Sequence, residues 1–180
     1  MATTSRALAL AATLLTATVA LCMTLVAVGN ITDFGTNQQF VRHVLAMDTT
    51  FRDEDLMWRA ITTPWLQDAA YAAVVVWESA AALVLLAGTW LWLRRDRPRA
   101  RSVTTYGLLM VMLLFGAGFV AIGGEWFAMW QSETWNGLDA AMRMFLLSGI
   151  VLITVHLPPP ERTGTSEAAE APETSGAAEA

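Results

Sequence analysis

Charged residues inside or beside apolar segments are the first candidates for chemistry in this sequence. Glu78 and Arg143 each interrupt a long apolar segment, and Glu125 stands at the end of another. Counting about 1.5 Å per residue from the inner segment ends, Glu78 lies about 24 Å up and Arg143 about 21 Å up. An isolated charge costs about 2.5–3.5 kcal/mol within a bilayer. The similar depths therefore suggest a buried charge site formed by Glu78, Arg143 and Glu125.

This buried charge site has one functional interpretation and two structural ones. A functional site would bind an anion or relay protons beneath the outer loop. Alternatively, Glu78 and Arg143 form a purely structural ion pair. In the third interpretation, Arg143 bonds to Asp139 one turn earlier and extends outward, while Glu78 is protonated and neutral. We favour the structural interpretations, because either one removes the cost of charge in lipid without a ligand.

Polar side chains are dense in the loop between the first two apolar segments, residues 29–68. Asn and Asp side chains readily hydrogen-bond to their own backbone, so we expect them mainly to fix the loop. The alternative is a polar surface that binds a ligand or a partner. The candidates for that surface are Asn30, Asp33, Asn37, His43 and Asp48.

Signals for metals and cofactors are weak. His43 and Asp48 are five residues apart, off a single helical face, and no second histidine is near them. His156 falls on the other side of the membrane, so the two histidines cannot both ligate one haem within the chain. The single cysteine, Cys22, excludes an intramolecular disulfide. We predict no metal site and no cofactor.

Motifs of several catalytic classes do not occur in the sequence. It contains no HExxH pair, no phosphate-binding loop and no dinucleotide fingerprint. The formal net charge is −5, every basic residue is arginine, and no broad basic face is visible, so we expect no nucleic-acid partner. Enzyme activity stays open, but a non-enzymatic role is favoured.

Composition and hydropathy indicate the elements that must position these residues. Hydrophobic residues make up 55% of the chain and charged residues 15%, which is unlike a soluble domain. Four segments are long and apolar enough to cross a hydrocarbon core of about 30 Å. We predict an all-α, polytopic membrane protein with one four-helix domain, residues 1–157. The predicted spans are 7–28, 69–93, 103–122 and 138–157.

The distribution of arginine predicts the orientation. Five arginines lie within residues 94–101, between the second and third spans, and the connection between the third and fourth spans has none. Because cytoplasmic loops carry an excess of Arg and Lys, this loop and both termini are predicted to be cytoplasmic. Residues 158–180 consist mostly of Pro, Glu, Ala, Ser, Thr and Gly, which predicts a disordered acidic cytoplasmic tail.

The outer loop is predicted to form a short helical extracytoplasmic cap over residues 36–61. Thr36 and Gln39 match a capping box, and apolar residues then recur near helical spacing, which predicts a helix over 36–47. A second stretch, residues 53–61, begins with acidic side chains that suit a helix N-terminus.

Several runs of residues in the outer loop and second span resemble a known family. The runs are Asn30–Phe34, Asn37–Thr50, Trp58–Ile61, Tyr71 and Trp77–Glu78. They are similar to a bacterial family of predicted small four-helix integral membrane proteins, which is catalogued as a domain of unknown function. The resemblance covers about residues 7–157. It implies four membrane helices and a multi-pass protein of the bacterial inner membrane, and it implies no activity.

Three hypotheses for function follow. The first is a non-enzymatic accessory or interaction subunit that packs against a larger membrane assembly or self-associates within the lipid bilayer. The second is a small transporter or proton-coupled carrier that uses Glu78 and Arg143. The third and weakest is a membrane enzyme that binds quinone, lipid or metal at the outer face.

Overall fold

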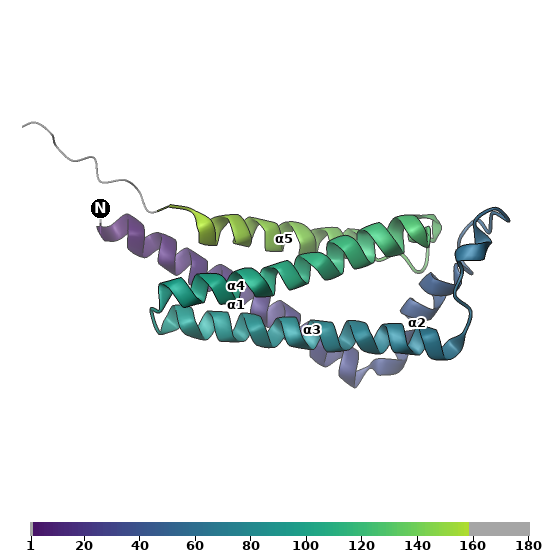
Figure 1. Cartoon of the computed structure of the whole chain (residues 1–180), viewed down its shortest axis with the longest axis horizontal. Coiled ribbons are helices and arrows are strands. Elements are labelled where there is room, and N and C mark those ends of the chain that lie inside the picture. Colours follow the sequence, from purple (N-terminus) through teal and green to yellow (C-terminus); the bar gives the residue numbers. More distant parts are fainter. Residues whose placement is uncertain (1, 159–180) are drawn as a thin grey trace, which may run out of the picture.

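The computed structural model describes residues 2–158, and every regular element in that range is helical (Figure 1). Four helical segments are long and apolar enough to cross a membrane: Arg6–Thr32, Pro64–Leu93, Arg97–Trp126 and Leu138–His156. The prediction of an all-α protein with four spans is confirmed. The predicted tail, residues 158–180, lies outside the described residues except for its first one. The elements in order are α1 (Ala2–Thr32), α2 (Phe34–Ala46), η1 (Met57–Arg59), α3 (Pro64–Leu93), α4 (Arg97–Met112), η2 (Leu113–Trp126), η3 (Met129–Gln131) and α5 (Leu138–His156).

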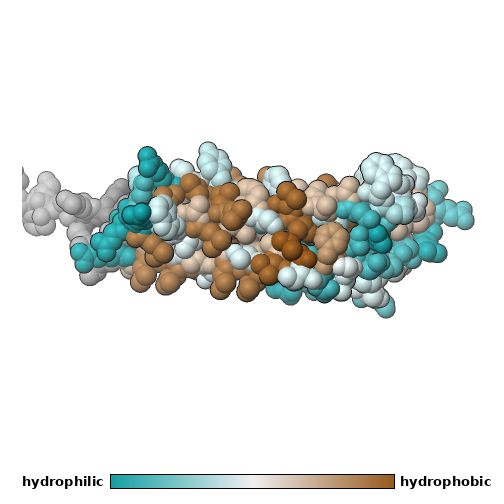
Figure 2. All heavy atoms as spheres, turned by 90° about the horizontal axis from the view of Figure 1, so that it is seen from below, coloured by the Kyte–Doolittle hydropathy of each residue, from teal (hydrophilic) through white to brown (hydrophobic). Residues whose placement is uncertain are grey.

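The four long segments form an elongated bundle in which α3 packs against both α1 and α4 (Figure 1). The core is apolar and includes Val19, Leu85, Leu108 and Val151, each fully buried. Outside, apolar residues cover the middle of the face seen in Figure 2, and hydrophilic residues gather at both ends. A lipid bilayer requires this distribution, because apolar side chains are then the ones in contact with the hydrocarbon.

The third membrane segment changes its winding halfway along. After Met112, α4 continues as η2, a π-helix, in which amides donate to the carbonyl five residues earlier. At its end the Phe127 amide donates to the Ile122 carbonyl at 3.0 Å. π-Helical turns are rare and occur often at functional sites. η2 carries four glycines, and two of them allow close packing: a Cβ at Gly116 would lie 2.7 Å from the Phe145 ring, and one at Gly124 2.8 Å from Leu138.

The cap lies over one end of the bundle, which we call the cap end. α2 begins at Phe34, with Asp33 at the N-cap position and no side-chain capping bond, so the predicted capping box at Thr36 is wrong. The helix ends when Met47 adopts a left-handed conformation and its amide donates to the Val44 carbonyl. The second predicted stretch, 53–61, forms only the short 3₁₀ helix η1.

Specific contacts fasten the cap to the membrane helices. Arg42 of α2 forms a two-pronged ion pair with Asp68 of α3, with Nε–Oδ1 and Nη2–Oδ2 distances of 2.8 and 2.9 Å. Gln38 also donates to Asp68 at 2.8 Å. The cap also bonds to the connection between η3 and α5, where the hydroxyls of Thr49 and Ser132 lie 2.8 Å apart. These contacts hold the cap in place over this end of the bundle.

Candidate functional site

Glu78 is the only acidic residue of the described chain that lies buried inside the bundle, with 2% of its surface exposed. Asn30 of α1 donates from Nδ2 to Glu78 Oε2 at 2.6 Å. Tyr71, also 2% exposed, donates from its hydroxyl to the Asn30 carbonyl at 2.9 Å. Tyr71 and Glu78 are seven residues apart, about two helical turns, so both lie on the face of α3 that packs against α1.

A cavity of about 320 Å³, which we call the Glu78 cavity, lies beside this carboxylate. Side chains of α1, α2, α3, η2 and α5 line it. Its polar lining consists of Asn30, Asn37, Tyr71 and Glu78, and its aromatic lining of Phe40, Tyr71, Phe115 and Phe119. Within residues 2–158, no side chain or amide donates a hydrogen bond to Glu78 Oε1. One carboxylate oxygen therefore lacks a protein donor.

Arg143 does not join this site. It lies on the exposed face of α5, while Ala141, two residues earlier, faces the bundle. Two residues correspond to about 200° around a helix, so the two side chains point in opposite directions. The ion pairs of the described residues are Arg42–Asp68, His43–Asp48 and Arg99–Asp96. Neither the expected Glu78–Arg143 pair nor the alternative Asp139–Arg143 pair is among them.

Glu125 is also separate from the cavity. It is exposed at the cap end of η2 and is not part of the cavity lining. The structure therefore brings only one of the three predicted charges, Glu78, to the candidate site. Matching depth along the sequence was a wrong guide to contact, because depth says nothing about which way a helix face points.

The polar residues of the outer loop separate into two groups. Asn30 and Asn37 line the Glu78 cavity, and Asn37 also donates to the Asp33 carbonyl at 3.2 Å, the kind of local bond expected for loop residues. His43 is half-buried: its ring stacks on that of Trp135 with the ring centres 4.6 Å apart, and its Nδ1 lies 2.8 Å from Asp48 Oδ2. No group of three metal-ligating side chains occurs in the described part of the chain.

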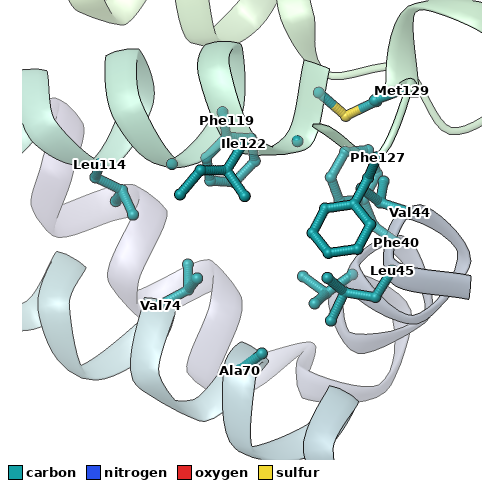
Figure 3. A pocket seen from close by; sticks show the side chains of 13 residues that line it. Phe40, Val44, Leu45, Ala70, Val74, Leu114, Phe119, Ile122, Phe127 and Met129 are labelled. Carbon is teal, nitrogen blue, oxygen red and sulfur yellow. The ribbon is translucent and has the colours of Figure 1, made fainter. Parts of the chain in front are cut away.

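Figure 3 shows a second hollow, which we call the apolar pocket. Its volume is about 130 Å³, and α2, α3, η2 and the segment after η2 form its wall. The side chains labelled in Figure 3 surround an open centre and present only carbon and the sulfur of Met129. The pocket and the cavity share four lining residues: Phe40, Val41, Val74 and Phe119.

The sequence identified Asn30, Asn37 and Glu78 as candidates, but it predicted neither their contacts nor the role of Tyr71. Asn30 and Glu78 are 48 positions apart, and only the packing of α1 on α3 brings them together. The available signal for Tyr71 was its spacing of seven from Glu78, which places both on one helix face.

Comparison with known proteins identifies the family of the chain. A family model described as "Predicted small integral membrane protein (DUF2165)" matches residues 8–158. The chain belongs to this family. The match covers all four membrane segments and the cap, and it agrees with the resemblance found in the sequence. No curated protein and no solved structure matches the chain.

Proposed function

We propose that this protein is a non-enzymatic membrane protein that binds a small molecule in the Glu78 cavity, beneath a fixed cap. One observation carries the proposal: a carboxylate that is 2% exposed faces a cavity and keeps one oxygen without a donor in residues 2–158. Buried charge in a membrane is costly unless a partner compensates it, and such residues commonly mark binding or transport sites. A ligand in the cavity supplies the missing partner.

The cellular setting follows from the same reasoning. The arginine cluster at residues 94–101 and the bacterial family resemblance support a bacterial inner membrane with this loop in the cytoplasm. The Glu78 cavity then opens in the outer half of the bilayer. In that position the protein acts either as a binding subunit or as a proton-coupled carrier that exchanges a proton on Glu78 for a ligand.

An accessory role is the second candidate, and the cap end favours it. Phe51, Trp58 and Trp130 are 73%, 70% and 52% exposed. All three pack edge-on against another ring, Phe51 against Trp130 and Trp58 against Trp126, and the Arg59 guanidinium lies 4.7 Å from the centre of the Trp126 ring. A fixed aromatic surface suits docking to a membrane-protein partner or to a second copy. A stoichiometric protein partner in native-lipid preparations would distinguish this role from ligand binding alone.

The test of the proposed function uses dicyclohexylcarbodiimide, an apolar reagent that attacks protonated carboxyl groups. The carboxyl oxygen bonds to the carbodiimide carbon, the proton moves to nitrogen, and rearrangement leaves a stable acylurea. We expect one adduct at Glu78 in the purified protein, mapped by peptide mass spectrometry. Glu78→Gln should remove it, and the matched control Glu125→Gln should keep it, because Glu125 lies outside the cavity. If Glu78 does not react while exposed carboxylates do, the cavity is closed to small molecules and the proposal is wrong.

A further inference from the structure

We infer that the ligand of the Glu78 cavity is a cationic amphiphile, with an ammonium-type head against Glu78 and an apolar body reaching the apolar pocket. This inference rests on the proposed function and specifies its ligand. Two independent observations carry it: the charge of the cavity lining, and the adjoining pocket that presents no nitrogen or oxygen side-chain atom.

The charge of the head follows from the lining of the cavity. Glu78 is its only charged side chain, and the lining contains no Lys, Arg or His. On the helices that line the cavity, Arg42 of α2 pairs with Asp68, and Arg143 lies on the exposed face of α5. A buried carboxylate without a protein cation complements a positive ligand and repels an anion. The anion site considered from the sequence is therefore disfavoured.

The aromatic lining strengthens the preference for an ammonium head. Phe40, Phe115 and Phe119 line the cavity together with Tyr71. Phe40 and Phe119 stack with their ring centres 6.2 Å apart, and Phe115 lies 5.5 Å from Phe119. Aromatic faces attract cations, and alkylated ammonium groups are commonly recognised by aromatic rings. The amide of Asn37 offers one further polar contact within the cavity.

The apolar body follows from the second hollow. The stacked rings of Phe40 and Phe119 belong to the walls of both the cavity and the apolar pocket, so a ligand that passes them enters an apolar space. On η2, Gly118 leaves part of this space open, since a Cβ added there would have Leu114 Cδ1 as its nearest neighbour, at 3.8 Å. A hydrocarbon chain or ring fits this pocket, whereas a polar group would lose its hydrogen bonds.

The experiment measures protection of Glu78 from the carbodiimide in nanodiscs of phosphatidylglycerol, a lipid without an amine. Three probes separate the parts of the ligand: dodecyltrimethylammonium, neutral dodecanol, and tetramethylammonium. We expect dodecyltrimethylammonium to protect at the lowest concentration and dodecanol not to protect. Nanodiscs that also contain phosphatidylethanolamine identify the source of the amine: protection there without an added probe indicates a lipid headgroup, and its absence indicates a free amphiphile.

Two variants fill the apolar pocket from opposite walls, Gly118→Leu on η2 and Ala70→Leu on α3. Each should weaken protection by dodecyltrimethylammonium about tenfold, the effect of displacing about two methylene groups from an apolar site. Protection by tetramethylammonium should not change. The matched control is Ala121→Leu, which adds the same side chain to the exposed face of η2. Thermal unfolding in detergent, at an unchanged midpoint, shows that each variant is folded.

Two results would overturn the inference. Equal protection by dodecanol would mean that the head need not be cationic, and full protection in both pocket variants would mean that the apolar body lies elsewhere. In either case Glu78 still reacts with the carbodiimide, so the proposed function survives. A Glu78 that never reacts instead refutes the proposed function itself.

Discussion

Removal of the carboxylate at Asp68 should loosen the cap from the membrane helices. Asp68 accepts two hydrogen bonds from Arg42 and one from Gln38. Hydrogen bonds to charged groups contribute about 1.5–3 kcal/mol when shielded from water. The Arg42 and Asp68 side chains are 32% and 39% exposed, so solvent screens the pair. We expect Asp68→Asn to lower the free energy of unfolding by about 1–2 kcal/mol.

A double-mutant cycle isolates the pair from the other effects of each substitution. The variants are Asp68→Asn, Arg42→Gln and both together, and the measurement is thermal unfolding in detergent. We expect a coupling of about 1 kcal/mol, because two charge-assisted bonds are lost together.

The matched control is the pair of Asp96 and Arg99, which lies at the opposite end with a 3.5 Å contact and an Arg99 side chain that is 80% exposed. Its coupling should stay below about 0.5 kcal/mol. If the Arg42–Asp68 coupling is no larger than that of the control, the ion pair does not hold the cap.

Two further predictions concern packing and orientation. Gly88→Ala should destabilise the protein by about 1–3 kcal/mol, because the new Cβ would lie 2.7 Å from Thr104 Oγ1 and 3.3 Å from the Thr104 backbone. The control is Gly149→Ala, whose new Cβ would have its nearest atom 3.7 Å away and which should leave thermal unfolding in detergent unchanged. In a Cys22→Ser background, a cysteine replacing Glu133 should react with an impermeant maleimide in intact spheroplasts and one replacing Ser102 should not; the reverse pattern would invert the predicted orientation.

The span architecture was predictable from the sequence because lipid imposes a strict rule. Backbone polar groups within a bilayer must bond within their own segment, so each long apolar run becomes a helix. The cap helix was predictable from its apolar spacing, but its start was misplaced. Thr36 and Gln39 matched a capping box, yet the chain is already helical from Phe34. α1 ends at Thr32 and α2 begins at Phe34, so the chain is almost continuously helical there, and this tertiary arrangement overrides the local capping motif.

The candidate site was predictable only in part. The depth of Glu78 is a property of one helix and can be counted along the sequence. Its bond to Asn30 and the outward direction of Arg143 depend on how the helices rotate against one another, which hydropathy does not encode. The π-helix η2 was likewise missed, because an apolar, glycine-rich run is compatible with either hydrogen-bond register.

The fixed cap accounts for how a cavity beside a buried carboxylate stays open. A hollow beside a charge is unfavourable in a flexible bundle, since helices that can shift will close the space and repack around apolar groups. Here the Arg42–Asp68 pair ties α2 to α3, two of the helices whose side chains line the cavity, and the Thr49–Ser132 bond holds the segment after α2. The helices therefore cannot collapse onto Glu78 without breaking contacts at the cap end. A fold that only needed a stable core would place an apolar residue at position 78, so the combination of rigid walls, an open cavity and a carboxylate with one free oxygen in residues 2–158 supports a binding site rather than a packing defect.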